Sequence, residues 1–243
     1  MIRLVVGLGN PGKEYERTRH NVGFWLVERF AAAHGIVLRK DAKFQALVGR
    51  HNANGPWLLL PQTFMNASGR PVQMLAGFFK IPAAEILVVH DELDFPPGTA
   101  RLKQGGGIAG HNGLKDISQR LATHEYWRLR IGVGKPADKD AGADYVLHKP
   151  AAEERTAIDA AIDNAIAILP LLLAGDMQGA MQKLHSQDKT VEPPKPEAKK
   201  VEAKKVEAKK VEEKKVAEQK VPAEEPRPGG LAGFFRGLTG RRK

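Results

Sequence analysis

Short apolar runs alternate with segments of helical periodicity over residues 1–188, and this alternation limits the fold most strongly. It is typical of layered α/β proteins, in which helices cover a central sheet. The run 86–89 is wholly apolar, as expected of a strand that is covered on both faces. Residues 1–188 are therefore predicted to fold as one α/β domain.

The same pattern predicts individual elements. Strands are expected at 2–6, 46–50, 57–61, 86–89 and 129–133. Helices are expected at 21–34, after Asn66, at 153–173 and at 176–185. The helix after Asn66 is predicted to bury Val72, Leu75, Phe78 and Phe79. A kink or an early end is expected at Pro170, inside the third helix.

The composition changes abruptly after residue 188. Prolines open a linker, and near-copies of the pentapeptide VEAKK follow from Val201. Valines five residues apart do not share one helix face, so this repeat cannot build a core. Residues 189–243 carry 16 basic and 9 acidic side chains, whereas residues 1–188 carry 22 and 19. A low-complexity charged tail is predicted, disordered or helical and solvated, ending in a short amphipathic basic segment at 231–243.

The chain contains no cysteine, which excludes disulfides, thiolate nucleophiles and cysteine-ligated metal sites. No signal-peptide pattern is expected at the N-terminus, because Arg3 leads directly into an apolar strand. The longest apolar run, 165–174, is interrupted by Pro170 and is too short to span a membrane. These features predict a cytoplasmic protein without stable membrane association.

The glycine-rich segment 7–12 follows a predicted strand and satisfies G-x-G-x-x-G, one mark of a dinucleotide site. In such a site the helix opens within the glycines, whereas here a turn and a polar run come first. A dinucleotide-binding oxidoreductase is therefore the weaker alternative. The preferred interpretation is a tight loop that presents Asn10 to a ligand.

A histidine and nearby carboxylates form the candidate acid–base group. His20 precedes the first predicted helix, whose positive end disfavours a charged imidazole, and a neutral histidine suits a general base. Asp91 follows the buried strand, at the end of the sheet where α/β proteins place their sites. The preferred interpretation is one carboxylate that orients a histidine. The alternative is a divalent-metal site formed by His90, Asp91 or Asp94 with His111.

Three asparagines complete the candidate site: Asn10, Asn66 and Asn112. The last of them follows the glycine-rich segment 105–111, which reads as a mobile loop. Amides donate and accept hydrogen bonds, so they can hold a peptide backbone or stabilise an oxyanion. No serine nucleophile has an evident motif. The residues therefore predict hydrolysis, in which water attacks and a histidine acts as general base.

Together the motifs of residues 1–186 resemble bacterial peptidyl-tRNA hydrolase. They are GLGNPGxxYxxTRHNVGF at 7–24, TFMNxSG at 63–69, HDELDxPPG at 90–98, GGGxxGHNGLKD at 105–116 and RLRIGVG at 128–134. The resemblance implies a monomeric, three-layer α/β domain with a mixed, twisted central sheet flanked by helices. It also implies an esterase that needs no cofactor and separates a peptide from the 3′ end of tRNA, recycling tRNA from abandoned translation.

The resemblance also implies roles for residues at matching positions. His20 is the proton acceptor that activates water, and Asp91 stabilises its reactive form. Asn10 lies where the family distinguishes a blocked peptidyl group from a free aminoacyl group. The positions that contact the peptidyl and 3′-terminal parts of the substrate are Tyr15, Phe64, Asn66 and Asn112. The basic positions that hold the tRNA 5′ phosphate are Lys103 and Arg130.

The chain departs from the family pattern at the pair 108–109, which is less polar and poorer in glycine, at Pro170 in the helix that serves as a lid, and beyond Gln187. The tail is expected to be a solubilising extension that adds nonspecific RNA contacts at most. Docking of segment 231–238 on a partner or a membrane is the lesser alternative. A catalytically silent RNA-binding relative is disfavoured by the presence of the complete acid–base and amide set.

Overall fold

The computed structural model describes residues 1–50, 52, 54–136, 138 and 141–186. The predicted tail 189–243 and its terminal segment 231–243 lie outside the described residues. The described strands are β1 (Leu4–Gly7), β2 (Arg39–Asp41), β3 (Ala46–Arg50), β4 (Trp57–Pro61), β5 (Ile86–Glu92), β6 (Ala100–Gln104) and β7 (Trp127–Gly132). The α-helices are α1 (Val22–Ala33), α2 (Gly69–Phe78), α3 (Asn112–Leu121), α4 (Gly142–Tyr145), α5 (Ala152–Ala174) and α6 (Met177–Ser186). Short 3-10 turns are η1 (Arg19–Asn21), η2 (Met65–Ala67) and η3 (Ala83–Glu85).

The described strands form one mixed sheet in the order β2-β3-β4-β1-β5-β7-β6. Strands β4, β1, β5 and β7 run parallel to one another. Strands β2, β3 and β6 join by antiparallel pairing. Every residue of β1 and β5 is buried, which explains why β1 and the first four residues of β5 read as continuous apolar runs in the sequence. The carboxyl ends of the parallel strands meet at one edge of the sheet, where the polar motifs follow them.

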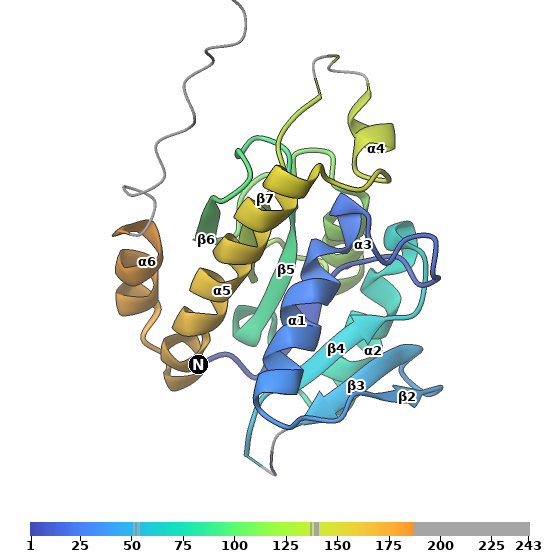
Figure 1. Ribbon diagram of the computed structural model, residues 1–243. Helices are drawn as coiled ribbons and strands as arrows, with labels where there is room; N and C mark the ends of the chain where they lie inside the picture. The colour runs from blue at the N-terminus through green and yellow to red at the C-terminus, as the bar shows by residue number, and fades with distance from the viewer. Residues whose placement is uncertain (51, 53, 137, 139–140, 187–243) are drawn as a thin grey trace, which may run out of the picture. The chain divides into compact units, whose positions relative to one another are not determined.

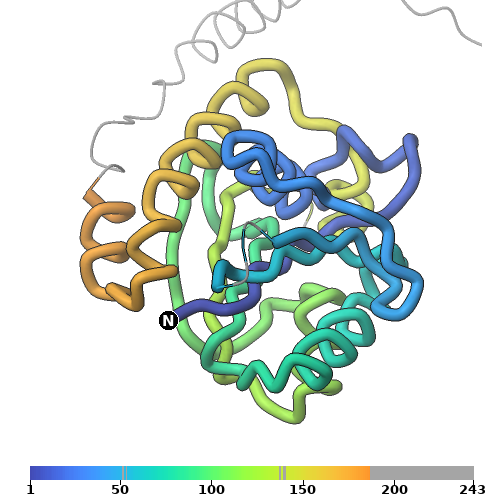
Figure 2. Tube along the Cα trace, turned by 90° about the horizontal axis from the view of Figure 1, so that it is seen from below, coloured from blue at the N-terminus to red at the C-terminus, as the bar shows by residue number. Residues whose placement is uncertain are grey.

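Helices cover both faces of the sheet, as Figures 1 and 2 show. On one face α1, α5 and α6 bury aliphatic side chains against the strands. On the other face α2 and α3 form a second core with the opposite side chains of the same strands. The expected three-layer α/β domain with a mixed central sheet is therefore confirmed.

Two glycines allow α1 to lie very close to the sheet. A Cβ atom on Gly23 would collide with the backbone of Leu8 and Val89, and one on Gly7 would collide with the carbonyl of Gly23. The amide of Phe24 donates a hydrogen bond to the carbonyl of Leu8 at 3.2 Å. This close approach puts η1, at the start of the helix, beside the carboxyl ends of β1 and β5.

Two details of the helix predictions are wrong. Of the kink or early end expected at Pro170, the early end is wrong, because helix α5 continues through Pro170 to Ala174. Pro170 is exposed, whereas Leu169 and Leu172 in the same turns are fully buried, so core packing offsets the hydrogen bond that proline removes. Phe78, expected on the buried side of α2, is 56% exposed because it lies in the last turn, beyond the edge of the core.

The pattern also fails to predict β2 and β6, the two edge strands of the sheet. β2 has the sequence RKD and exposes most of it, and β6 alternates buried and exposed residues over ARLKQ. Edge strands carry charged side chains because one of their sides meets solvent. Their sequences therefore lack the apolar runs that reveal the central strands.

Helix α5 is long and apolar enough to cross a membrane, with a mean hydropathy of 1.8 in its most apolar window. One face of the helix, which includes Ile158, Ile162 and Ile168, is fully buried in the core that α5 shares with α1 and the sheet. A core helix of a folded domain meets the same length and hydropathy criteria, and its packing identifies α5 as one.

Candidate active site

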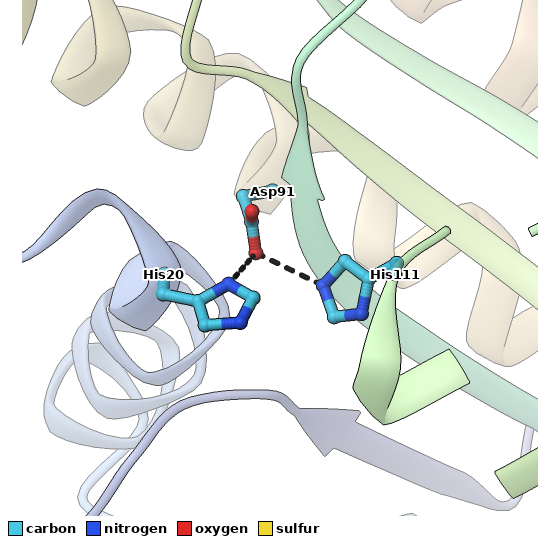
Figure 3. Close-up of side chains that lie close together, drawn as sticks. All are labelled: His20, Asp91 and His111. Atoms are coloured by element: carbon cyan, nitrogen blue, oxygen red, sulfur yellow. Dashed lines mark hydrogen bonds and ion pairs between the residues drawn. The ribbon is translucent and has the colours of Figure 1, made fainter. Parts of the chain in front are cut away.

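His20 and Asp91 come from different layers and meet at the carboxyl edge of the sheet. His20 lies in η1, directly before α1, and Asp91 is the second-last residue of strand β5. Nδ1 of His20 is 2.9 Å from Oδ1 of Asp91, a contact that Figure 3 marks with a dashed line. Both side chains are buried, with 10% and 3% of their surface exposed. The structure thus brings together the pair that the sequence singles out.

The electrostatics of this pair differ from the expectation based on the helix end alone. Burial lowers the pKa of His20, but the charge and hydrogen bond of Asp91 raise it more, so the net pKa lies above the usual imidazole value. Burial raises the pKa of Asp91, but His20 and His111 together hold it well below the usual carboxyl range. Asp91 is therefore ionised at neutral pH and accepts the Nδ1 proton of uncharged His20, which leaves Nε2 free to accept a proton.

A second histidine binds the same carboxylate oxygen. Nε2 of His111 lies 3.0 Å from Oδ1 of Asp91. His111 is also the N-cap of α3, and its Nδ1 accepts the backbone N–H groups of Gly113 and Leu114 at 3.2 and 3.4 Å. Because Nδ1 accepts, the ring proton lies on Nε2 and is donated to Asp91. In the sequence His111 is predicted only as a candidate metal ligand, and its role as a helix cap follows from its place directly before α3.

The residues that could bind a metal ion in the structure differ from the predicted set, which is His90, Asp91 or Asp94 with His111. Ligand atoms of His20, Asp91 and His111 lie within 4.8 Å of one another, a spacing that a metal ion can bridge. All three atoms are already joined by hydrogen bonds, and Asp94 forms an exposed ion pair with Lys135 at 2.8 Å. The arrangement fits a hydrogen-bonded acid–base group.

His90 adds an uncharged ring behind this group. Its Nδ1 donates to the backbone carbonyl of Asp91 at 2.6 Å. Burial, helped by the neighbouring His111, lowers the pKa of His90 to about 3. His90 therefore adds no positive charge beside the carboxylate at neutral pH.

Asn10 is fixed by hydrogen bonds on three of its groups. Its Oδ1 accepts the N–H of Met65 at 2.7 Å, and its backbone N–H and carbonyl both pair with the side-chain amide of Asn21 at 2.9 Å. Since Oδ1 is occupied, Asn10 presents its NH₂ group to the pocket. Asn21 is the N-cap residue of α1, but its side chain binds Asn10 instead of capping the helix.

These groups line a pocket of about 650 Å³, large enough for part of a substrate chain. Its polar lining includes the acid–base group and all three predicted asparagines: His20, Asp91, His111, Asn10, Asn66 and Asn112. Its apolar lining includes Met65, Leu93, Ile108, Val146 and Leu147. The pocket therefore combines amide groups with an apolar wall beside a paired imidazole.

The aromatic candidates lie at the rim. Phe64 lines the pocket and is 63% exposed. Tyr15 is not part of the lining but packs edge-on against Phe64, with ring centroids 6.4 Å apart. An exposed ring beside a polar pocket suits stacking on a nucleobase.

The two basic candidates, Lys103 and Arg130, lie outside the pocket lining, on the antiparallel ribbon of β6 and β7. Lys103 pairs with Arg128 across the ribbon, and Arg101 pairs with Arg130, so all four point to one face of it. Arg130 donates to Glu92 at 2.9 Å, and its guanidinium lies 4.3 Å from the centroid of the Phe95 ring. The ribbon thus concentrates positive charge at one side of the site.

Arg128 anchors the glycine-rich loop that leads to α3. Its buried guanidinium donates to the carbonyl of Gly107 at 2.8 Å and to that of Gly105. In this loop Ala109, at one of the positions that depart from the family pattern, has a φ of 47°. A left-handed conformation costs an alanine about 1 kcal/mol more than a glycine, so the substitution places local strain in the pocket wall.

The glycine pattern at 7–12 does not form a dinucleotide site. Helix α1 begins at Val22, well beyond Gly12, whereas the helix of a dinucleotide site opens within the glycines. The loop instead delivers Asn10 to the pocket, as the preferred interpretation predicts.

Comparison with known proteins agrees with this geometry. The profile of the peptidyl-tRNA hydrolase family matches residues 4–192. Peptidyl-tRNA hydrolase of Thiobacillus denitrificans is 56% identical over 185 residues, which cover 76% of this chain and 91% of that protein. That of Methylobacillus flagellatus is 55% identical over 189 residues, or 77% and 98% of the two chains. The crystal structure of peptidyl-tRNA hydrolase from Acinetobacter baumannii is 47% identical, covers 75% and 94% of the chains, and has a TM-score of 0.73. The chain therefore belongs to the peptidyl-tRNA hydrolase family.

Proposed function

We propose that this chain cleaves the ester between peptide and tRNA in peptidyl-tRNA, with His20 as the general base. The observation that carries the mechanism is the 2.9 Å contact between His20 and Asp91 within the amide-lined pocket. It leaves Nε2 of a buried imidazole available for a proton, which a general base requires. Family membership supports the substrate.

The reaction follows from the protonation states of the pair. Nε2 of His20 takes a proton from water as the water oxygen bonds to the ester carbonyl carbon. Asp91 stabilises the resulting imidazolium, and the amide of Asn66 donates to the oxyanion. The tetrahedral intermediate then breaks its bond to the ribose oxygen, which takes the proton from His20. The products are a peptide with a free carboxyl group and a tRNA with a free terminal hydroxyl.

The remaining pocket residues bind and select the substrate. The fixed NH₂ group of Asn10 donates to a carbonyl oxygen of the peptidyl group, which a free aminoacyl group lacks. Asn112 binds beside it, while Phe64 and Tyr15 stack against the 3′-terminal part of tRNA. Recognition of the blocked amino end thus depends on amide hydrogen bonds.

The tRNA body is held by charge. Lys103 and Arg130 bind the 5′ phosphate from the ribbon of β6 and β7, and the position of Arg101 on the same face supports this role. Because binding releases counterions from the phosphates, tRNA affinity should fall as salt rises.

Release of peptide from peptidyl-tRNA, with unblocked aminoacyl-tRNA as the control, tests the function. Peptidyl-tRNA should be cleaved and aminoacyl-tRNA should not. The same rate is expected in a chelator, because we propose a cytoplasmic monomer that uses no metal or cofactor. A catalytically silent RNA-binding relative would bind tRNA but leave the ester intact. Loss of activity in the chelator, restored by a divalent ion, would favour the metal alternative.

The rate should rise with pH through the pKa of His20. Only the uncharged imidazole accepts a proton from water, so kcat/KM is lost as pH falls below this pKa. Because Asp91 raises the pKa, the midpoint of the acid limb is expected above the usual 6.5. Measurement of kcat/KM from about pH 5 to 9 gives the midpoint. A midpoint below 6.5 would contradict the effect of Asp91.

Removal of the tail should leave catalysis unchanged. A chain that ends at Glu192 keeps every residue that the family profile matches. It loses the whole basic excess of residues 189–243, because the charges of the retained Lys189 and Glu192 cancel, so tRNA affinity should weaken slightly at low salt only. kcat and salt-dependent tRNA binding measure both effects. A fall in kcat would show that the tail takes part in the reaction.

A further inference from the structure

Arg19 directly precedes the proposed base in the chain, yet its side chain binds the distant segment 145–149. Its Nη1 donates to the carbonyls of Tyr145, His148 and Lys149 at 3.4, 3.2 and 3.1 Å. Its Nη2 donates to Glu154 at 2.7 Å, and the guanidinium lies 3.9 Å from the centroid of the Tyr145 ring. Only 7% of the side chain is exposed. A buried cation with this many partners holds them in one arrangement.

The backbone repeats the same connection. The N–H of Arg19 donates to the carbonyl of His148 at 3.1 Å, and the N–H of His20 donates to that of Val146 at 2.9 Å. Val146 and Leu147 line the pocket. The backbone of the base is therefore bonded directly to the apolar wall that faces the substrate.

The contacts require the chemistry of arginine. Carbonyls at the end of a short helix such as α4 lack partners within that helix, and the planar guanidinium can donate to several of them at once. The ring of Tyr145 adds a face for the cation, and its hydroxyl donates to the carbonyl of Val133 at 3.1 Å. Glu154 lies in the first turn of α5 and accepts the N–H of Ala151 as well. Arg19 thus joins η1 to α4, α5 and the segment between them.

We propose that Arg19 is a positioning residue that holds the segment 142–149 and the backbone of His20 as one unit. This rests on the proposed role of His20. The unit fixes the distance between the imidazole and an ester bound against Val146 and Leu147. Losing it displaces the base from the ester, and small displacements of reacting groups lower the rate by up to about 100-fold. The tRNA body is bound elsewhere, so KM changes far less than kcat.

Arg19→Lys tests the proposal, because lysine keeps the charge but cannot bond to all these carbonyls. The expected result is a fall in kcat of about 10- to 100-fold with a KM within about threefold of the unmodified enzyme. Arg155→Lys is the matched control, since Arg155 also lies over an aromatic ring, that of Trp25, and binds a carboxylate, that of Asp159, outside the pocket lining. Its kcat should stay within about twofold. Assays are run below the melting temperature of every variant.

A second pair of variants decides the matter if Arg19→Lys does not fold. Tyr145 is only half-buried, so its replacement is tolerated better. Tyr145→Phe keeps the ring under the guanidinium, whereas Tyr145→Leu removes it, so Tyr145→Leu should lower kcat more. Equal kcat values for this pair, or an unchanged kcat in Arg19→Lys, would overturn the proposal. His20→Ala is assayed in parallel. If it is inactive while the Arg19 and Tyr145 variants keep their kcat, the positioning role of Arg19 is rejected and the role of His20 stands. If His20→Ala is active, the proposed role of His20 is rejected, and the proposal for Arg19 with it.

Discussion

His20→Ala should lower kcat for peptidyl-tRNA hydrolysis by about 10²–10⁴-fold, the usual contribution of a positioned general base. The variant retains Asp91 and the amide-lined pocket, so substrate is still bound and water attacks without a proton acceptor. Single-turnover release of peptide measures the chemical step, and binding of deacylated tRNA measures affinity, which should not change.

His34→Ala is the matched control for that experiment. His34 lies at the opposite end of the same helix and is exposed, and its Nδ1 donates to the carbonyl of Phe30 at 2.8 Å. Its kcat should equal that of the unmodified enzyme. If His20→Ala lost tRNA binding and kcat to the same extent, misfolding would explain the result, and the general-base role would be rejected.

Asp91→Asn should be the second most harmful change, with a loss in kcat of at least about 10-fold. The carboxylate oxygen of Asp91 accepts from both His20 and His111. An asparagine that turns its NH₂ group toward His20 forces the ring proton onto Nε2, the atom that must accept a proton from water. The variant therefore loses the productive tautomer as well as the stabilising charge.

The pH profile separates this explanation from simple unfolding. Asp91 is the cause that raises the pKa of His20, while burial lowers it. With the charge removed, burial dominates, so the acid limb of kcat/KM should move to lower pH as the maximum falls. Asp163→Asn, which alters an exposed carboxylate paired with Arg29, should leave both unchanged. A reduced rate with an unshifted acid limb would contradict the proposed coupling.

The sequence predicts the centre of the fold better than its margins. Strands β1 and β5 are buried on both faces, so hydrophobicity alone reveals them. The edge strands β2 and β6 are defined by pairing with a neighbour, which no local pattern records. Pro170 illustrates the same limit, because the packing of α5 against the sheet outweighs a local signal to stop.

The candidate site shows a similar division. His20, Asp91 and the three asparagines are predicted from local motifs, and they line one pocket. The bonds that set their protonation and orientation join residues far apart in the chain, as in His111 with Asp91 and Asn21 with Asn10. Residue types indicate which groups can react, whereas the tautomers and orientations of these side chains depend on contacts that form only in the folded chain.

His111 links the active site to the fold, because both of its ring nitrogens make hydrogen bonds. Its Nδ1 accepts backbone N–H groups in the first turn of α3, and its Nε2 donates to Asp91 near the end of β5. Sliding of the helical layer over the sheet would have to break one of these bonds. A reagent that alkylates this imidazole would therefore remove the cap of α3 and a hydrogen bond to Asp91 at the same time. The melting temperature and kcat should then fall together.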